Sequence, residues 1–183
     1  MHAMAREFGQ TQLYVGAAYI REELKRLGVS PWFGPRELVR PLENLRIDGR
    51  MLAIRRVIFY DAIDERAPTA QEHERYLDQL GRLPGTLVRL GAVTGTRNRR
   101  QKGVDMRMGR DMMVAAQSGL IDYIALASGD ADFIPAIQQV QDLGPIVLVL
   151  AFQSSLSSDL QWEADRVFLL PENSDRIWAI DKP

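Results

Sequence analysis

The chain has no cysteine, and its 183 residues include only two histidines, His2 and His73. The absence of cysteine excludes disulfides, thiolate metal sites and a cysteine nucleophile. Two histidines are too few for an imidazole-rich metal site and make a Ser-His-Asp triad a poor candidate. No run of 18 apolar residues is present, and the N-terminus lacks the apolar core of a secretory signal. We therefore expect a cytoplasmic protein with no membrane partner, whose chemistry rests on carboxylates.

The chain also lacks an excess of charge of either sign. It carries 23 basic and 24 acidic residues, a net charge of −1, so its overall charge does not indicate a nucleic-acid binder. However, 20 of the 23 basic residues are arginine, which makes better forked contacts with phosphate than lysine does. The positions of the charges are therefore more informative than their sum.

Strand-like and helix-like segments alternate along a chain whose length suits one domain. This alternation predicts an α/β fold, a Rossmann-like three-layer sandwich with a mostly parallel central sheet. Thr69 and Glu72 are spaced as a capping box for one of the helices, and the three tryptophans are expected to pack. The expected strands are 12–15, 51–62, 86–93, 123–127, 146–150 and 166–170, and the expected helices are 19–27, 70–83, 104–118, 133–143 and 154–163.

The domain itself is expected at residues 11–170, between an N-terminal extension (1–10) and a C-terminal tail (171–183). The apolar tail segment 177–180 can pack back on the domain or support a homodimer. Residues 94–102 form a polar, basic connection that we expect to be a loop.

Acidic residues follow several of the expected strands. Ligands of parallel sheets bind at the carboxyl ends of the strands, and here these ends carry Gly16, Asp61, Asp130 and Asp132, with a loop leading to Asp105. Asp61 can hold a metal ligand in position without contacting the metal itself, or it can bind RNA through water. Alternatively, it simply closes a turn with Ala62.

The segment 128–133, Ser-Gly-Asp-Ala-Asp-Phe, is the most informative stretch. A continuously apolar strand runs into Ser128 and Gly129, which allow a tight turn, and then into two carboxylates two residues apart. Asp132 can cap the following helix. A cap accounts for one of the two carboxylates but not for both.

A second acidic pair, Asp105 and Asp111, lies on the helix expected at 104–118. Six residues turn an ideal helix by about 600°, which places the two side chains about 120° apart. Asp105 can cap the helix, whereas Asp111 lies among residues expected to be buried and needs a partner or a metal. Clustered carboxylates coexist when a cation bridges them, and oxygen ligands suit Mg²⁺ or Mn²⁺. We therefore take Asp105, Asp111, Asp130 and Asp132 as candidate metal ligands and catalytic residues for phosphodiester hydrolysis.

Four cations lie within six residues just before that helix: Arg97, Arg99, Arg100 and Lys102. Beside a carboxylate site, such a cluster suits the phosphate backbone of RNA. The same pattern also occurs in solvated surface loops. We assign these four residues to RNA binding, together with Ser128, which would also shape the acidic turn.

Three motifs together resemble the NYN domain family of the PIN-like nuclease superfamily, close to its LabA-like branch. They are Leu-Tyr-Val-Gly-Ala-Ala-Tyr at 13–19, Lys-Gly-Val-Asp at 102–105 with the later Asp111, and Ser-Gly-Asp-Ala-Asp-Phe at 128–133. The resemblance covers roughly residues 11–170. It implies a PIN-like sheet and a metal-dependent endoribonuclease that uses Mg²⁺ or Mn²⁺.

The first motif departs from the family at one position. The family has an aspartate at the end of the first strand, where this chain has Gly16. The loss of one ligand is expected to weaken metal binding and leave activity low or absent. Gly16 is either an introduced substitution that silences the nuclease or a natural change in a chain that binds RNA without cutting it. The other acidic positions are intact, which favours the first explanation.

The sequence bears on three other classes of protein. A non-catalytic module that binds RNA or protein would keep the fold without the chemistry. A haloacid-dehalogenase-type phosphohydrolase needs two aspartates after the first strand, and Val15-Gly16-Ala17-Ala18 does not supply them. A dinucleotide-binding Rossmann enzyme lacks its glycine-rich fingerprint there.

Overall fold

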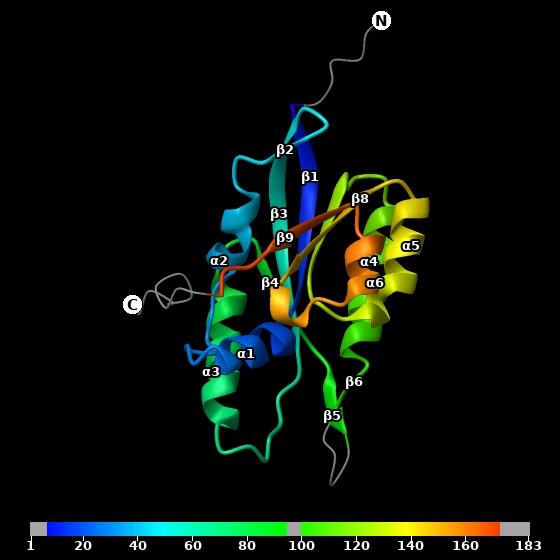
Figure 1. Ribbon diagram of the computed structural model, residues 1–183. Coiled ribbons are helices and arrows are strands. Elements are labelled where there is room, and N and C mark those ends of the chain that lie inside the picture. Colours follow the sequence, from blue (N-terminus) through cyan, green and yellow to red (C-terminus); the bar gives the residue numbers. More distant parts are fainter. Residues whose placement is uncertain (1–6, 95–99, 173–183) are drawn as a thin grey trace, which may run out of the picture.

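A computed structural model of the protein describes residues 7–94 and 100–172 and shows a central sheet of seven strands (Figure 1). The strands lie in the order β2-β3-β1-β7-β8-β9, and β4 pairs with the second half of β3. All pairings in this sheet are parallel except that of β2 with β3. The strands are β1 Phe8–Gly16, β2 Arg46–Ile47, β3 Arg50–Asp61, β4 Thr86–Leu90, β7 Tyr123–Ala127, β8 Ile146–Ala151 and β9 Arg166–Leu169.

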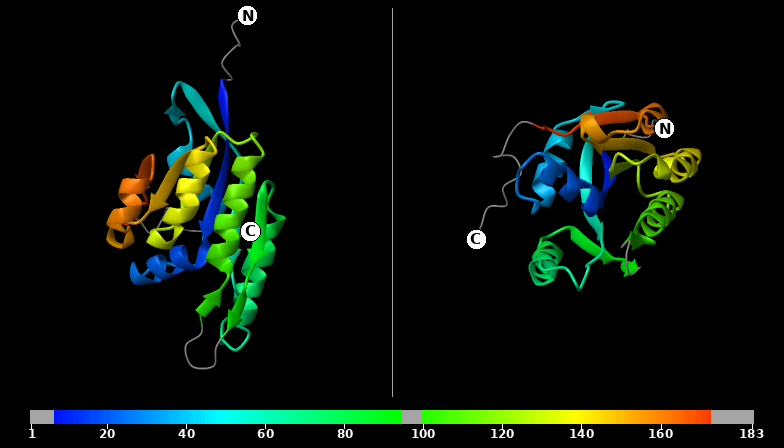
Figure 2. Two further views of the ribbon diagram at one scale, coloured as in Figure 1. Left: turned by 90° about the vertical axis from the view of Figure 1, so that its right-hand side faces the viewer. Right: turned by 60° about the horizontal axis from the view of Figure 1, so that its bottom comes forward.

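Helices cover both faces of this sheet and complete a three-layer sandwich, which confirms the predicted fold class (Figures 1 and 2). One layer holds α1 Ala17–Arg26, α2 Pro35–Val39 and α3 Ala70–Arg82, and the other holds α4 Val104–Gln117, α5 Ile134–Asp142 and α6 Ser158–Glu163. Three short 3₁₀ turns complete the described helices: η1 Arg40–Leu42, η2 Ala131–Phe133 and η3 Gln153–Ser155.

The alternation of side chains along the strands divides the core into two. Leu13 and Val15 pack with the α1–α3 layer, whereas Tyr14 packs with the α4–α6 layer. Strand β7 is buried along its whole length because both of its faces are covered, which explains its unbroken apolar sequence. Within the described residues, no helix is long and apolar enough to cross a membrane.

The predicted boundaries differ from the structure in three places. The helix predicted at 154–163 is the 3₁₀ turn η3 followed by the shorter helix α6. Strand β1 begins at Phe8, within the predicted extension, because its first residues already pair with β3 from Met51 onward. The strand predicted at 86–93 breaks at Gly91, whose N–H donates to the carbonyl of Asp61. The chain then leaves the sheet and forms a separate antiparallel pair, β5 Ala92–Thr94 with β6 Arg100–Lys102, where a loop was expected.

Two predictions about side chains are wrong. Thr69 makes no capping hydrogen bond, and the Glu72 carboxylate instead accepts a hydrogen bond of 3.0 Å from the Trp32 indole. Trp32 packs against His73 and Tyr76, but Trp162 on α6 is 88% exposed rather than packed. Trp178 lies outside the described residues.

Gly129 occupies a position that has no room for a side chain. A Cβ there would overlap the carbonyl oxygen of Ser155 and come within 2.9 Å of the Tyr19 hydroxyl. The backbone after β7 therefore packs directly against the backbone after β8, and glycine is required sterically.

We expect Gly129→Ala to lower the free energy of unfolding by about 1–3 kcal/mol, the usual cost of overpacking. Urea unfolding at neutral pH measures this. Gly81→Ala is the matched control, because a Cβ there meets only a methyl of Val88 at 3.9 Å inside helix α3. That control should raise stability by about 0.5–1 kcal/mol. Equal stabilities for Gly129→Ala and the parent would contradict the close packing.

Candidate active site

The carboxyl ends of the parallel strands meet at one edge of the sheet, as expected. Strands β1 and β7 are direct neighbours, with Val15 opposite Ala127. This register sets Gly16, the residue after Val15, beside the start of the turn that follows β7. Two of the three sequence motifs are therefore adjacent in space.

The turn after β7 is held by its own side chains and by the neighbouring loop. The N–H of Asp130 donates to the Ser128 hydroxyl at 3.3 Å, and the N–H of Asp132 donates to Oδ1 of Asp130 at 2.9 Å. The Gly129 carbonyl accepts a hydrogen bond from the N–H of Ser157. Asp130 rather than Asp132 therefore caps the following turn, and the backbone of both acidic residues is fixed.

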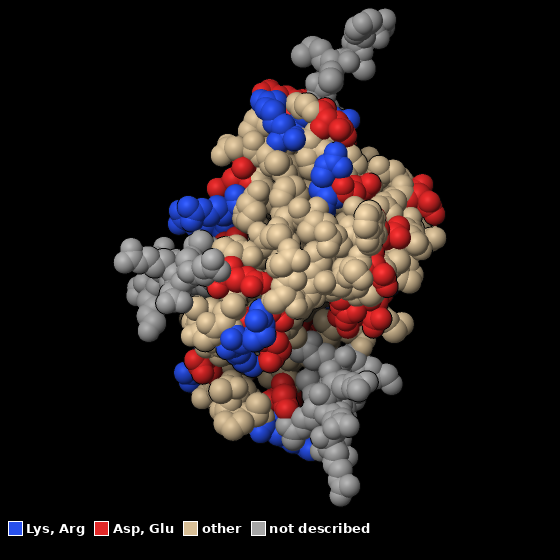
Figure 3. Space-filling view, viewed as in Figure 1, with Lys and Arg blue, Asp and Glu red and all other residues tan. Residues whose placement is uncertain are grey.

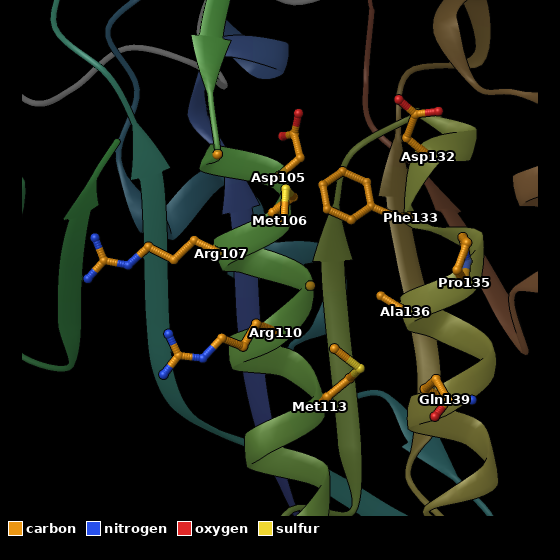
Figure 4. A pocket seen from close by; sticks show the side chains of 12 residues that line it. Asp105, Met106, Arg107, Arg110, Met113, Asp132, Phe133, Pro135, Ala136 and Gln139 are labelled. Carbon is orange, nitrogen blue, oxygen red and sulfur yellow. The ribbon is translucent and has the colours of Figure 1, made fainter. Parts of the chain in front are cut away.

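Asp105 faces this turn from the first turn of α4. It follows Gly103, which takes a left-handed conformation with φ of 78° where β6 passes into the helix. Asp105, Asp130 and Asp132 are all exposed, and Figure 4 shows Asp105 and Asp132 on either side of Phe133. Partial desolvation raises the pKa of Asp105, and the negative charges of Asp130 and Asp132 raise it further. The three residues, here called the acidic trio, thus repel one another.

Asp111, a fourth predicted ligand, is directed elsewhere. Its Oδ2 accepts a hydrogen bond of 2.7 Å from the Tyr60 hydroxyl and lies 3.2 Å from Nε of Arg89. Burial, together with the hydrogen bond to Asp111 and its negative charge, raises the pKa of Tyr60, so that the phenol remains a donor. Because the six-residue spacing places Asp105 and Asp111 on different sides of α4, the two carboxylates do not meet. Asp111 instead links α4 to Tyr60 of β3 and Arg89 of β4.

Asp61 lies at the predicted sheet edge but is fully buried and does not support a site there. It accepts two hydrogen bonds from the Arg21 guanidinium, one from the N–H of Ala62 at 2.8 Å, and lies 2.8 Å from Nε2 of His73. Burial alone would raise the pKa of Asp61, but the hydrogen bonds from His73 and Arg21 outweigh it and lower the pKa. The carboxylate does accept the Ala62 N–H, but the chain after Asp61 is irregular and forms no turn there.

The sequence does not reveal this buried ionic cluster, because Arg21 lies among charged residues of a helix whose polar face would ordinarily meet water. Arg21 is only 7% exposed. No local signal distinguishes it from its charged neighbours on α1, since its partner, Asp61, comes from β3 and is shared with His73 of α3.

The structure describes three of the five residues predicted to bind RNA. Arg97 and Arg99 lie outside the described residues. Arg100 and Lys102 lie on β6, opposite Thr94 and Ala92, and β6 leads directly into α4 and Asp105. Ser128 is only 2% exposed, so it shapes the turn, as expected, but offers no surface to RNA.

Gly16 shows no conformational need for glycine. Its φ of −73° is accessible to any residue. A Cβ there would lie 3.4 Å from the Ala127 carbonyl oxygen and 3.8 Å from both Met108 Cε and Tyr19 Cβ, all ordinary contact distances. The backbone at position 16 can therefore carry a side chain without rearrangement.

The acidic residues that the structure describes do not form a complete metal site. Within residues 7–94 and 100–172, no three His, Cys, Asp or Glu side chains are grouped so as to hold a metal ion. Gly16 offers no ligand, and Asp111 is held by Tyr60 and Arg89. The donors of this chain, as they stand, do not fit a tightly bound divalent cation.

A parallel sheet with exposed acidic residues at its carboxyl edge is the arrangement expected of a PIN-like nuclease domain. The chain belongs to the NYN domain family, whose match extends over residues 18–171. NYN domains are generally nucleases. The match names the NYN domain and assigns the chain to no particular branch of the family.

A solved structure supports the fold. The crystal structure of a protein of unknown function from Vibrio parahaemolyticus RIMD 2210633 is similar, with a TM-score of 0.67 and 14% sequence identity. The alignment covers 92% of this chain and 97% of that one. At this identity the likeness concerns the fold alone. No curated protein gives a significant match.

Asp61→Asn should lower the free energy of unfolding at pH 7 by about 3–5 kcal/mol, because it leaves the buried Arg21 charge without its counter-ion. Since folding lowers the pKa of Asp61, its stabilisation is complete above about pH 4 and disappears as pH falls through the folded-state pKa. The gap between variant and parent should therefore shrink in acid, as measured by urea unfolding from pH 7 to pH 3.

The control is Asp78→Asn, which removes an exposed ion pair with Arg82. It should change stability by less than about 1 kcal/mol. A gap for Asp61→Asn that stays constant with pH would argue against the ionic role of Asp61.

Asp130→Asn should lower the pKa of Asp105, because it removes one of the two negative charges that face it. Carboxyl-carbon NMR titration measures this directly. Asp142→Asn, at the far end of α5, is the control and should leave Asp105 unchanged. An unchanged Asp105 titration in Asp130→Asn would show that the two carboxylates do not interact.

Proposed function

We propose that this chain is an endoribonuclease scaffold of the NYN type whose acidic site lacks one carboxylate, so that its hydrolysis of RNA is weak or absent. Its partner is RNA, and its expected location is the cytoplasm. The observation that carries the proposal is the geometry of Gly16: a glycine without conformational need, with space for a side chain, stands beside the turn of Asp130 and Asp132.

The acidic trio supports this proposal on electrostatic grounds. Asp130 and Asp132 raise the pKa of Asp105, and this repulsion destabilises the fold unless a cation or a cationic partner relieves it. A divalent cation held by a complete ligand set activates water for attack on a phosphodiester. Mg²⁺ and Mn²⁺ suit oxygen ligands of this kind. In this chain a fourth carboxylate at position 16 is missing, and we assign low activity to that gap.

Exposed arginines on α4 support the RNA partner. Arg107 and Arg110 are exposed on the flank of α4 that looks toward β4, and the Arg107 guanidinium donates to the carbonyl of Leu90 at 3.0 Å. Arg100 and Lys102 precede them on β6. Arg107 and Arg110 thus place two positive charges along α4, the helix that begins next to Asp105, an arrangement suited to a phosphate backbone.

Gly16→Asp should produce RNA cleavage that depends on Mg²⁺ or Mn²⁺ and is abolished by chelator. We expect the cleavage rate to rise more than about 100-fold over the parent. Removal of a residue that only hydrogen-bonds to a metal ligand already lowers metal affinity or activity by about 10–100-fold, and a direct ligand should matter more. The measurement is cleavage of labelled single-stranded and structured RNAs, with metal affinity followed by calorimetry.

Gly16→Asn is the matched control, with the same shape and no charge, and should remain inactive. The double variant Gly16→Asp/Asp130→Asn should lose the restored activity. If Gly16→Asp binds metal but cleaves no RNA, the proposal is overturned.

The shortfall of metal ligands favours a second function, an RNA-binding module that does not cut. This alternative predicts RNA affinity that falls steeply with salt, persists in chelator, and gains no cleavage from Gly16→Asp. Filter binding across a salt series, with and without chelator, distinguishes the two.

A further inference from the structure

An elongated groove of about 830 Å³ runs between helices α4 and α5. It begins at the acidic trio, since Asp105 and Asp132 line one end, and extends to Gln139 (Figure 4). Its volume falls within the range of about 300–1,000 Å³ that is typical of small-molecule sites. The groove is therefore continuous with the proposed catalytic edge and large enough for part of a nucleotide.

Small residues at the helix crossing form the floor of this groove. A Cβ at Gly109 would lie only 3.2 Å from the Cβ of Ala136, so α4 and α5 approach each other closely there. Met106 and Met113 rise from α4, and Pro135 and Ala136 come from α5. The walls are therefore largely apolar. Met106 is 82% exposed, which is unusual for a large apolar side chain.

The charges around the groove are segregated. The side chains of Arg107 and Arg110 extend from α4 away from α5, toward β4 (Figure 4). Among the described lining residues, these arginines are the only cations, so no cationic head group points into the groove. Figure 3 shows Asp and Glu side chains gathered where α5 and α6 reach the carboxyl edge of the sheet. A phosphate is thus favoured on the outer flank of α4 and disfavoured inside the groove.

We propose that this groove receives an unstacked base of single-stranded RNA, next to the phosphodiester that lies at the acidic trio. This inference rests on the proposed function, because it assigns the RNA strand to the same edge. The sugar-phosphate backbone crosses α4 with its phosphates at Arg107 and Arg110, and the base lies between Met106, Met113 and Pro135.

The chemistry of the walls suits a base. Every base has a flat π face that binds apolar and polarisable surfaces, and methionine sulfur makes favourable contacts with aromatic rings. The Gln139 amide offers both a donor and an acceptor for a base edge. A base paired within a duplex cannot enter a groove between two helices, so the groove selects single strands.

The test uses the full chain and three fluorescent RNAs: a ten-nucleotide oligouridine, the same strand with abasic nucleotides, and a duplex of equal length. Fluorescence anisotropy should show the base-containing single strand bound about tenfold more tightly than the abasic strand, the range expected for one base contact. Met106→Ala and Ala136→Phe, which respectively remove a wall and fill the floor, should reduce that preference to about twofold. Neither should change affinity for the abasic strand.

Val114→Phe is the matched control, because Val114 is exposed on the same helix but does not line the groove. It should keep the full preference. Met106 is exposed, so Met106→Ala tests the groove even if Ala136→Phe fails to fold.

The outcomes separate the two proposals. If Gly16→Asp cleaves oligouridine while the abasic strand or the duplex binds as tightly as oligouridine, the groove inference is overturned and the proposed function stands. If no RNA binds to any variant, both are overturned. If Met106→Ala changes sedimentation of the protein but not RNA affinity, the groove belongs to a second copy of the chain and the inference is overturned.

Discussion

The arrangement of the acidic edge depends on the parallel register between β1 and β7. Because Val15 lies opposite Ala127, the residue that ends β1 and the turn that follows β7 become neighbours, although more than a hundred residues separate them. The turn is then fixed by packing, since the Gly129 backbone meets the Ser155 carbonyl. Tyr19 reinforces this arrangement from α1: its hydroxyl lies 2.9 Å from Oγ of Ser155 and accepts a hydrogen bond from the N–H of Phe152. A rigid backbone thus presents Asp130 and Asp132.

Aspartates near the same sheet edge serve different purposes according to what surrounds them. Asp61 is fully buried and paired with Arg21 and His73, so its charge is neutralised within the fold. Asp111 binds a tyrosine and an arginine and holds α4 against the sheet. The acidic trio, by contrast, is exposed, and Asp130 and Asp132 repel Asp105. The fold therefore concentrates uncompensated negative charge in one place, which is where an external cation or a cationic partner gains most by binding.

Much of this could be predicted from the sequence, because its strongest signals are local. The continuous apolar run before Ser128 predicts a buried parallel strand, and the strand-end rule then places Gly16 and Asp130 at one edge. The remainder depends on contacts that no local pattern encodes. Arg21 is buried because it pairs with Asp61 of β3, and Trp162 stays exposed because the short helix α6 buries only Leu160. The departure of the chain from the sheet at Gly91 likewise follows from where β3 ends.

The ordinary backbone conformation of Gly16 has a consequence for how such a protein changes over time. Packing places no constraint on this position, since a Cβ can be added or removed there without backbone strain or collision. Packing alone would therefore neither preserve an acidic residue at position 16 nor eliminate it, and its charge would matter only through the carboxylates nearby. Chemistry and fold are therefore decoupled at this residue. A lineage can drift between a cutting and a non-cutting form while the rest of the domain, with its separately buried ionic cluster, persists unchanged.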